Sequence, residues 1–312
     1  YDSFLRSPTF ASSSAPELVI RFGAMPTSKH YQLWLERHIQ CQQFVVGNGS
    51  NSDPTHGLTQ SINAHTTVFC EQLADYLDLY AVPGWQDKLW RSQFEQAEAI
   101  ATETIDRFLA STDILFEGKV FAELANWLPK DVWIYIASST PIRDLDTFFQ
   151  PRQHIPVLAN RGANGIDGTV SSALGAAWRS EQPTILVCGD LAFYHDLNGL
   201  MAVKQYNINL TIILLNNNGG GIFELLPISN FEPPFEQFFG TPHGLDFDPI
   251  VKAYGCGYAQ IQDWAHFQSA VLESVSQPGT QVLEIESDRK RDKHLRQNLW
   301  QSIATKVDRH FS

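Results

Sequence analysis

Basic residues are scarce in this sequence, and so are long apolar runs. Lys and Arg total 22 against 34 Asp and Glu, which leaves a formal net charge of −12. Nucleic acids and anionic lipid surfaces attract clusters of lysine and arginine, so neither is an expected partner. The longest apolar stretches have the length of a strand, well short of the roughly 18 residues that a membrane-spanning helix needs. We therefore expect no nucleic-acid partner and no membrane span.

Cysteine is also rare, and no CxxC pair occurs. The four cysteines, Cys41, Cys70, Cys188 and Cys256, stand far apart and mostly lie in or beside apolar runs. This spacing indicates small buried side chains in a reducing compartment. The first residue is Tyr1, and no basic-then-apolar signal pattern follows it. We expect a cytoplasmic location and a chain that is a fragment or a processed product.

The first third of the sequence predicts a modest α/β domain. A length of 312 residues with 43% hydrophobic and 18% charged residues leaves room for two globular domains. Short apolar runs and amphipathic segments in this third predict strands at 17–22, 43–46 and 66–69, a loop at 47–63, and helices at about 27–39, 71–79 and 87–109. We predict a domain at 1–110 that is truncated at its start.

Strands and helices alternate through the rest of the chain. The pattern predicts helices at 117–127, from Pro141 onward, at 169–179 and at 263–276, and strands at 131–137, 184–188, 210–215 and 281–285. Such alternation is typical of a doubly wound parallel sheet with right-handed crossovers. We expect this second domain to span 111–312. Its segment 230–247, rich in proline and phenylalanine, fits no regular element and is predicted to be a lid, a binding loop or an interface segment.

Two polar segments follow the buried strands of this second domain. Gly189-Asp190 ends one strand, and Asn216-Asn217-Asn218 with three glycines ends the next, which places Asn217 27 positions after Asp190. Each segment alone is ordinary turn chemistry. Together they lie at the carboxyl edge of a parallel sheet, where such sheets bind ligands. Because Mg²⁺ takes six oxygens and few carboxylates, the pair predicts a magnesium and diphosphate clamp.

This clamp resembles the signature of the thiamine diphosphate (ThDP) superfamily, whose members hold the cofactor through a divalent cation. The usual third motif residue is glycine, where this chain has Leu191. The resemblance implies an α/β ThDP-binding fold with doubly wound parallel sheets. It also implies Mg²⁺ or Mn²⁺ bound by the side chains of Asp190 and Asn217 and by the backbone carbonyl of Gly219.

Longer strings narrow the resemblance. Residues 160–168 (NRGANGIDG), 189–200 (GDLAFYHDLNGL) and 219–227 (GGGIFELLP) are similar to the 2-succinyl-5-enolpyruvyl-6-hydroxy-3-cyclohexene-1-carboxylate (SEPHCHC) synthase family, the MenD family of menaquinone and phylloquinone biosynthesis. The resemblance implies that 1–110 is a middle domain and 111–312 the diphosphate-binding domain. The pyrimidine-binding domain would come from a second subunit of a homodimer or homotetramer.

The same resemblance assigns roles to individual residues. Arg143, Arg161 and Lys29 would bind the dicarboxylate substrates, 2-oxoglutarate and isochorismate. Surface salt bridging is the alternative for the arginines, and helix surface is the alternative for the lysine. The cofactor-binding set would be Ser139, Ile166, Gly189, Asp190, Leu191, Asn217, Gly219, Ile222, Phe223 and Leu226. Ile166 would wedge the bent thiamine, although plain core packing is its alternative. For His195 we favour a structural role over acid/base catalysis.

The implied reaction is the decarboxylation of 2-oxoglutarate and 1,4-addition of the resulting succinyl carbanion to isochorismate, which gives SEPHCHC. The superfamily activates its cofactor with a glutamate of the pyrimidine domain, and no residue here matches that glutamate. The fragment alone is therefore predicted to be inactive. Another ThDP enzyme, such as an acetolactate synthase or a 2-oxoacid decarboxylase, is one alternative. A non-catalytic scaffold or regulatory domain is another.

Overall fold

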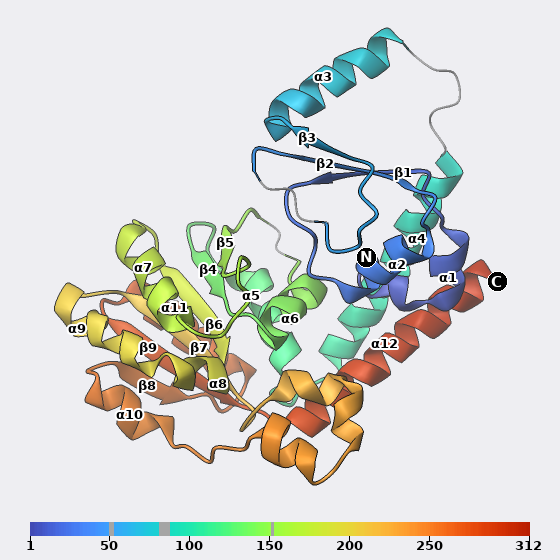
Figure 1. The fold of residues 1–312 in the computed structure, drawn as a ribbon. Coiled ribbons are helices and arrows are strands. Elements are labelled where there is room, and N and C mark those ends of the chain that lie inside the picture. Colours follow the sequence, from blue (N-terminus) through green and yellow to red (C-terminus); the bar gives the residue numbers. More distant parts are fainter. Residues whose placement is uncertain (50–52, 81–87, 151–152) are drawn as a thin grey trace. The chain divides into compact units, whose positions relative to one another are not determined.

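The computed structural model describes residues 1–49, 53–80, 88–150 and 153–312. The chain divides into two compact units (Figure 1). Unit 1 contains Tyr1–Phe108 together with Asn298–Ser312, and unit 2 contains Leu109–Gln297. None of the helices within the described ranges is long and apolar enough to cross a membrane.

Unit 1 contains a three-stranded parallel sheet in the order β1-β2-β3. Its strands are β1 (Leu18–Phe22), β2 (Gln42–Gly47) and β3 (Gln60–Asn63), and its helices include α1 (Pro8–Ser13), α2 (Lys29–Arg37), α3 (Thr66–Leu79) and α4 (Lys88–Ala110). The Ser28 side chain caps α2 by accepting the backbone N–H of Tyr31. The helix predicted at 87–109 is α4, and Asp87 itself lies outside the described residues.

The strand predicted at 66–69 is wrong, because these residues form the first turn of α3. Their β-branched and aromatic side chains favour a strand locally. The half-buried positions, however, are Phe69, Leu73 and Leu77, and a spacing of four is that of a helix face. The third strand is instead β3, which lies within the segment predicted as a loop.

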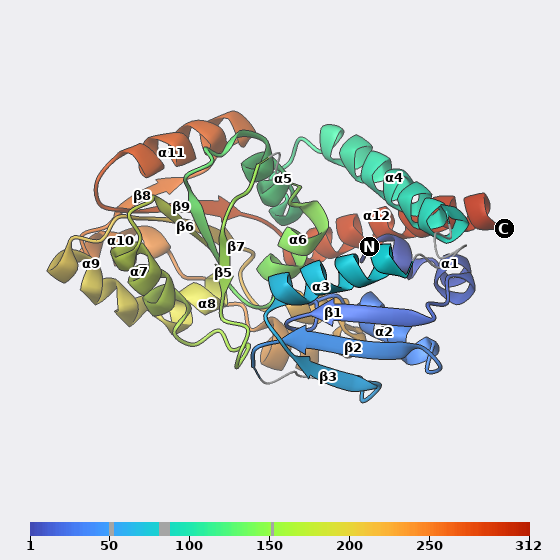
Figure 2. The same cartoon turned by 90° about the horizontal axis from the view of Figure 1, so that it is seen from above.

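Unit 2 is a doubly wound α/β domain, as predicted. Its six strands are all parallel, in the order β5-β4-β6-β7-β9-β8: β4 (Trp133–Ile136), β5 (Val157–Ala159), β6 (Thr184–Gly189), β7 (Leu210–Asn216), β8 (Gly257–Gln260) and β9 (Thr280–Glu286). Helices cover both faces of the sheet (Figure 2). One face carries α5 (Glu117–Trp127), α6 (Thr140–Phe148) and α11 (Trp264–Ser276), and the other carries α7 (Thr169–Arg179), α8 (Asp190–His195), α9 (Met201–Tyr206) and α10 (Phe247–Ala253).

The central strands β6 and β7 are apolar on both faces because both faces are covered. Residues 185–188 and 212–214 are completely buried, which explains their continuous rather than alternating hydrophobic pattern. The register pairs Gly189 with Leu215, so the segments that follow the two strands emerge side by side. The chain runs from β4 outward to β5 and then back to β6 on the other side. This is a topological switch point, where open α/β sheets bind ligands.

The last helix, α12 (Arg289–Phe311), has no counterpart in the sequence prediction. Its residues up to Gln297 belong to unit 2 and those from Asn298 to unit 1. In unit 1, the Lys306 Nζ donates to Thr104 Oγ1 of α4 at 3.0 Å. The assignment of 1–110 as a middle domain and 111–312 as a diphosphate-binding domain stays a prediction.

Candidate functional site

A cavity of about 350 Å³ lies at the carboxyl edge of the unit 2 sheet, where β4, β6 and β7 end. Its lining combines polar groups from three loops with an apolar wall: Glu117, Ser138, Ser139, Thr140, Pro141, Arg143, Ile166, Gly189, Asp190, Leu191, Ala192, Leu215, Asn217, Gly219, Gly220, Gly221, Ile222 and Phe223. The position at the switch point and the mixture of apolar wall and convergent polar groups are typical of a cofactor pocket.

Asp190 begins α8 directly after β6 and is almost completely buried. Its Oδ1 accepts the backbone N–H of Leu191 at 2.6 Å, and its Oδ2 accepts the N–H of Gly219 at 2.9 Å. The carboxylate therefore joins the end of β6 to the loop after β7. Backbone N–H donors satisfy part of its charge and fix its direction.

Asn217 supplies the second oxygen of the predicted clamp. Its Nδ2 donates to Glu117 Oε1 at 2.6 Å, whereas its buried Oδ1 has no hydrogen-bond partner among the described residues. A buried acceptor without a partner costs about 1 to 3 kcal/mol, so this oxygen is suited to an incoming ligand. One carboxylate, one amide oxygen and a backbone carbonyl match the oxygen preference of Mg²⁺. The described residues contain no group of three or more His, Cys, Asp and Glu that could hold a metal by themselves.

The glycines of residues 219–221 are required by close backbone contacts. A Cβ on Gly219, which has φ 142°, would lie 2.0 Å from the carbonyl oxygen of Gly240. A Cβ on Gly220 would lie 2.1 Å from the carbonyl oxygen of Phe239. No side chain fits in either place, so the glycine-rich loop packs directly on the backbone of the segment 230–247.

That segment, predicted to be a lid, a binding loop or an interface segment, lies against the clamp. After one π-helical turn (Glu236–Gly240), the Gly240 carbonyl accepts the N–H of Gly220 at 2.8 Å. The Nε2 of His243 lies 3.1 Å from Asp190 Oδ2. Because His243 Nδ1 accepts the N–H of Leu245 at 3.0 Å, the neutral ring carries its hydrogen on Nε2 and donates it to the carboxylate. The segment thus helps to orient Asp190.

The end of β4 forms another wall of the cavity. Ser139 has φ 77° and ψ −135°, a combination that non-glycine residues rarely adopt. Arg143 lines the cavity, and its Nη1 donates to the Ser139 carbonyl at 2.5 Å. Such strained residues concentrate at ligand sites, because the surroundings must hold them in place.

Most of the predicted site residues meet in this cavity, and three do not. Arg161 is exposed and donates to Ser138 Oγ at 3.4 Å, beside the lining rather than in it. Leu226 is 47% exposed, follows a 3₁₀ helix (Gly221–Leu225) and is not among the lining residues. Lys29 lies in unit 1. His195 is exposed at the end of α8 and is outside the lining. The roles of all these residues stay predictions.

Sequence reasoning missed two side chains that contact the clamp. Glu117 lies 100 positions before Asn217, and nothing local distinguishes it from any acidic residue in the first turn of a helix. His243 lies in the segment 230–247, which was predicted to be a lid, a binding loop or an interface segment. No residue pattern, however, connected His243 to Asp190. Only the folded chain brings Glu117 to the cavity and His243 to Asp190.

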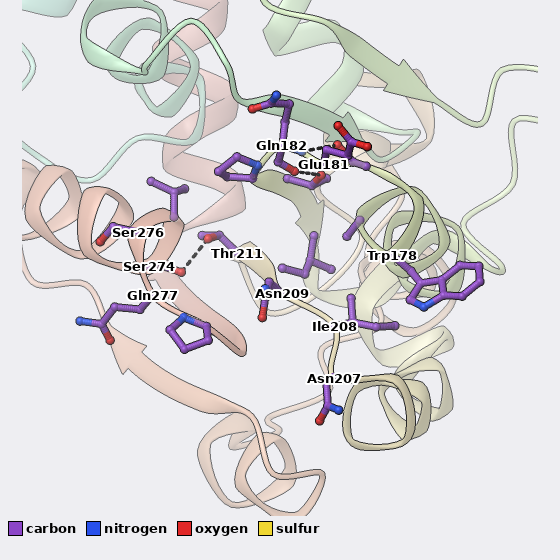
Figure 3. Close-up of a pocket in the computed structure, with 17 residues that line it drawn as sticks. Trp178, Glu181, Gln182, Asn207, Ile208, Asn209, Thr211, Ser274, Ser276 and Gln277 are labelled. Carbon is purple, nitrogen blue, oxygen red and sulfur yellow. Dashed lines mark hydrogen bonds between the residues drawn. The ribbon is translucent and has the colours of Figure 1, made fainter.

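A second cavity, of about 390 Å³, lies at the opposite edge of the same sheet, where the strands begin (Figure 3). Among its lining residues Glu181 alone is charged, and one hydrogen bond of 2.6 Å joins the hydroxyls of Thr211 and Ser274. A diphosphate needs basic side chains or a bound cation, and in open α/β sheets ligands bind at the carboxyl ends of the strands. The lining of this second cavity contains no lysine or arginine, and the cavity lies at the other edge of the sheet. The cavity of about 350 Å³ that contains Asp190 and Asn217 is therefore the candidate site.

Comparisons with known proteins define the class first. Residues 143–285 match the family model for the C-terminal TPP binding domain of thiamine pyrophosphate enzymes. A solved structure of a putative thiamin diphosphate-dependent enzyme from Mycobacterium smegmatis has the same fold, with a TM-score of 0.58 at 16% identity, and the match covers 87% of this chain and 48% of that one. Unit 2 thus contains a TPP-binding domain, which confirms the predicted fold and the thiamine diphosphate cofactor.

The particular relatives are SEPHCHC synthases. The enzyme of Geobacillus kaustophilus is 43% identical over 308 residues, which is 98% of this chain and 52% of the relative. That of Chloroflexus aurantiacus is 38% identical over 306 residues, 97% of this chain and 52% of the relative. The chain is a homologue of these synthases, as its motifs predict, and it spans about half the length of the curated relatives that it matches.

Proposed function

We propose that this chain is the cofactor-binding and substrate-binding half of a SEPHCHC synthase, which decarboxylates 2-oxoglutarate and adds the succinyl carbanion to isochorismate. The observation that carries the proposal is the buried Asn217 Oδ1, which has no hydrogen-bond partner in the described part of the chain and lies in one cavity with Asp190 and Gly219. It supports a cation site at the switch point of a TPP-binding domain. The similarity to SEPHCHC synthases along nearly the whole chain supports the choice of reaction.

Thiamine diphosphate supplies an electron sink that stabilises a carbanion. In the proposed site the side chains of Asp190 and Asn217, with the Gly219 carbonyl, would hold the Mg²⁺ or Mn²⁺ that neutralises the diphosphate. Ile166, Ile222 and Phe223 form the apolar wall. Ser139, Gly189 and Leu191 also line the cavity. This apolar wall would exclude water from the space beside the bound cofactor.

Two arginines, Arg143 in α6 and Arg161 after β5, support dicarboxylate substrates over monocarboxylates. Arg143 lines the cavity, and Arg161 contacts Ser138 at its rim. A guanidinium binds a carboxylate with two parallel hydrogen bonds, so two arginines fit a substrate with an additional carboxylate. An acetolactate synthase or a simple decarboxylase of pyruvate has no need of the second anchor.

The experiment has two parts. Calorimetry with ThDP and Mg²⁺ on the chain tests the cofactor site, with Asp190→Ala as the control that abolishes binding. Decarboxylation of 2-oxoglutarate is then compared with that of pyruvate in a polypeptide that also contains a pyrimidine-binding domain. Preference for pyruvate would support the acetolactate synthase or decarboxylase alternative, and absence of ThDP binding would support a scaffold.

The finer expectations about partners and location belong to the same proposal. We propose that a pyrimidine-binding domain of a second subunit completes the site in a homodimer or homotetramer, and that the chain alone is inactive. Four free cysteines, of which Cys41, Cys188 and Cys256 are buried, suit the reducing cytoplasm. Sedimentation of the protein with and without ThDP tests the assembly.

A further inference from the structure

Glu117 is a buried carboxylate on the wall of the candidate cofactor cavity. It is the first residue of α5, and only 2% of its surface is exposed. Its Oε1 accepts hydrogen bonds from Asn217 Nδ2 at 2.6 Å and from Ser287 Oγ at 3.0 Å. Burial of a carboxylate is costly unless hydrogen bonds and a counter-ion compensate it, so the partners of Glu117 define its role.

The contact with Glu117 decides which end of the Asn217 amide faces the cavity. The two ends of an amide are nearly equal in shape but opposite in chemistry, since one donates and the other accepts. An ionised carboxylate only accepts, so Asn217 must turn its NH₂ group toward Glu117. The Oδ1 then faces the other way, where it has no partner among the described residues. The amide is held with its acceptor available for a cation.

Glu117 is itself fixed in place. Arg296 is buried and donates from Nη2 to Glu117 Oε2 at 3.0 Å, and from Nε to Asp144 Oδ1 at 3.0 Å. Burial would lower the pKa of Arg296, but the Asp144 and Glu117 carboxylates outweigh it and raise that pKa, so the guanidinium stays charged. The backbone N–H of Glu117 donates to Asp292 Oδ2 at 3.1 Å. Side chain and backbone are both restrained before any ligand binds.

We propose that Glu117 is a positioning residue for the cation site, one that acts through Asn217 by fixing the direction of its amide oxygen. The proposal rests on the proposed function, because it assigns Asn217 as a ligand of the cation. Groups that orient metal ligands in this way typically change metal affinity by about 10- to 100-fold when they are removed. Glu117 makes no contact with the cation in this scheme.

A double-mutant cycle on Mn²⁺ affinity, measured by calorimetry or electron paramagnetic resonance in the presence of ThDP, tests the proposal. We expect Glu117→Ala to weaken Mn²⁺ binding by about 10- to 100-fold. In the Asn217→Ala background the same change should weaken Mn²⁺ binding by less than about threefold, because the effects of residues that act as one unit are not additive. Equal losses in both backgrounds, or no loss in either, would overturn the positioning role.

Matched variants separate positioning from folding. Ser287→Ala removes the other hydrogen bond to the same Glu117 oxygen and leaves that of Asn217 in place, so it should leave Mn²⁺ affinity within about twofold. If Glu117→Ala fails to fold, Glu117→Gln replaces it: its amide can face Asn217 with either end, so it should lose part of the affinity and remain folded. Wild-type affinity in a folded Glu117→Gln would contradict the proposal. If the wild-type protein binds no Mn²⁺ in the presence of ThDP, the proposed function itself is contradicted.

Discussion

Ser139 shows how a single residue stores strain at the site. Its positive φ occurs at the start of α6, and its side chain makes no capping hydrogen bond there. Non-glycine residues in such regions cost about 1 to 3 kcal/mol. The neighbouring Arg143 restrains this turn through the Ser139 carbonyl. Strain at one residue is thus balanced by contacts of the residues around it.

Ser139→Gly should therefore stabilise the protein. Glycine adopts positive φ without steric cost, so we expect a gain of about 1 kcal/mol in the free energy of unfolding. Urea unfolding at constant pH measures it. The control is Ser138→Gly, a position that is not among the residues with positive φ, where glycine should destabilise. A loss of stability in both variants would show that Ser139 is not strained.

Residue patterns predicted one part of the site and not another. Asp190, Asn217 and the glycines were predictable because each follows an apolar run that could only be a buried strand. The hydrogen bonds of Glu117 and His243 to these residues depend on how distant segments pack, which no local pattern contains. The direction of the Asn217 amide is a property of the folded state alone.

At the scale of elements, length and burial decided which predictions succeeded. Strands β6 and β7 were predictable because both of their faces are apolar, and α5 and α7 because their apolar periodicity is regular. The element α12 was missed because its sequence is mostly polar. The buried face of this helix is narrow: it combines Leu299, Ile303 and Val307 with charged contacts such as that of Arg296 with Asp144.

The junction of α5 and α12 predicts a pH dependence of stability. Burial, followed by repulsion from Glu117, raises the pKa of Asp292 from 3.8 to about 7. A carboxyl group with a raised pKa in the folded state stabilises the fold fully below its unfolded pKa, and this contribution is lost as the pH rises toward 7. Asp292→Asn removes the titration, so the stability of the variant relative to wild type should increase between pH 5 and pH 8.

Between pH 5 and pH 8 the free energy of unfolding of Asp292→Asn should increase relative to that of wild type by on the order of a few kcal/mol, since one pKa unit corresponds to about 1.4 kcal/mol. Urea unfolding at several pH values measures the relative slope, which is independent of any constant loss from the contact of Asp292 with Arg291. The control is Asp288→Asn, which removes an exposed carboxylate just before α12. Parallel pH profiles for Asp292→Asn and wild type would refute the shift.

At the scale of the whole molecule, net charge sets the conditions for cofactor binding. The chain carries a formal charge of −12, and both the cofactor's diphosphate and the proposed substrates are anions. General attraction cannot bring them to the site, so local cations must. In the proposed scheme a divalent ion and two arginines supply that positive charge.

Removal of divalent cations should therefore abolish most ThDP affinity. We expect EDTA treatment to weaken ThDP binding by more than about tenfold, which is about 1.4 kcal/mol, and Mg²⁺ or Mn²⁺ to restore it. Calorimetry on the treated and reconstituted protein measures the effect. Asn217→Ala should bind weakly in both conditions, and ThDP affinity that does not depend on divalent ions would contradict the cation site.

The contact between the glycine loop and the segment 230–247 has a consequence for protein engineering. Gly219 and Gly220 lie so close to the backbone of Gly240 and Phe239 that the shapes of the two segments must be complementary. A graft of residues 216–221 alone into a distant homologue would meet a surface shaped for a different loop. Transfer of cofactor preference between such enzymes would require both segments to travel as a single cassette.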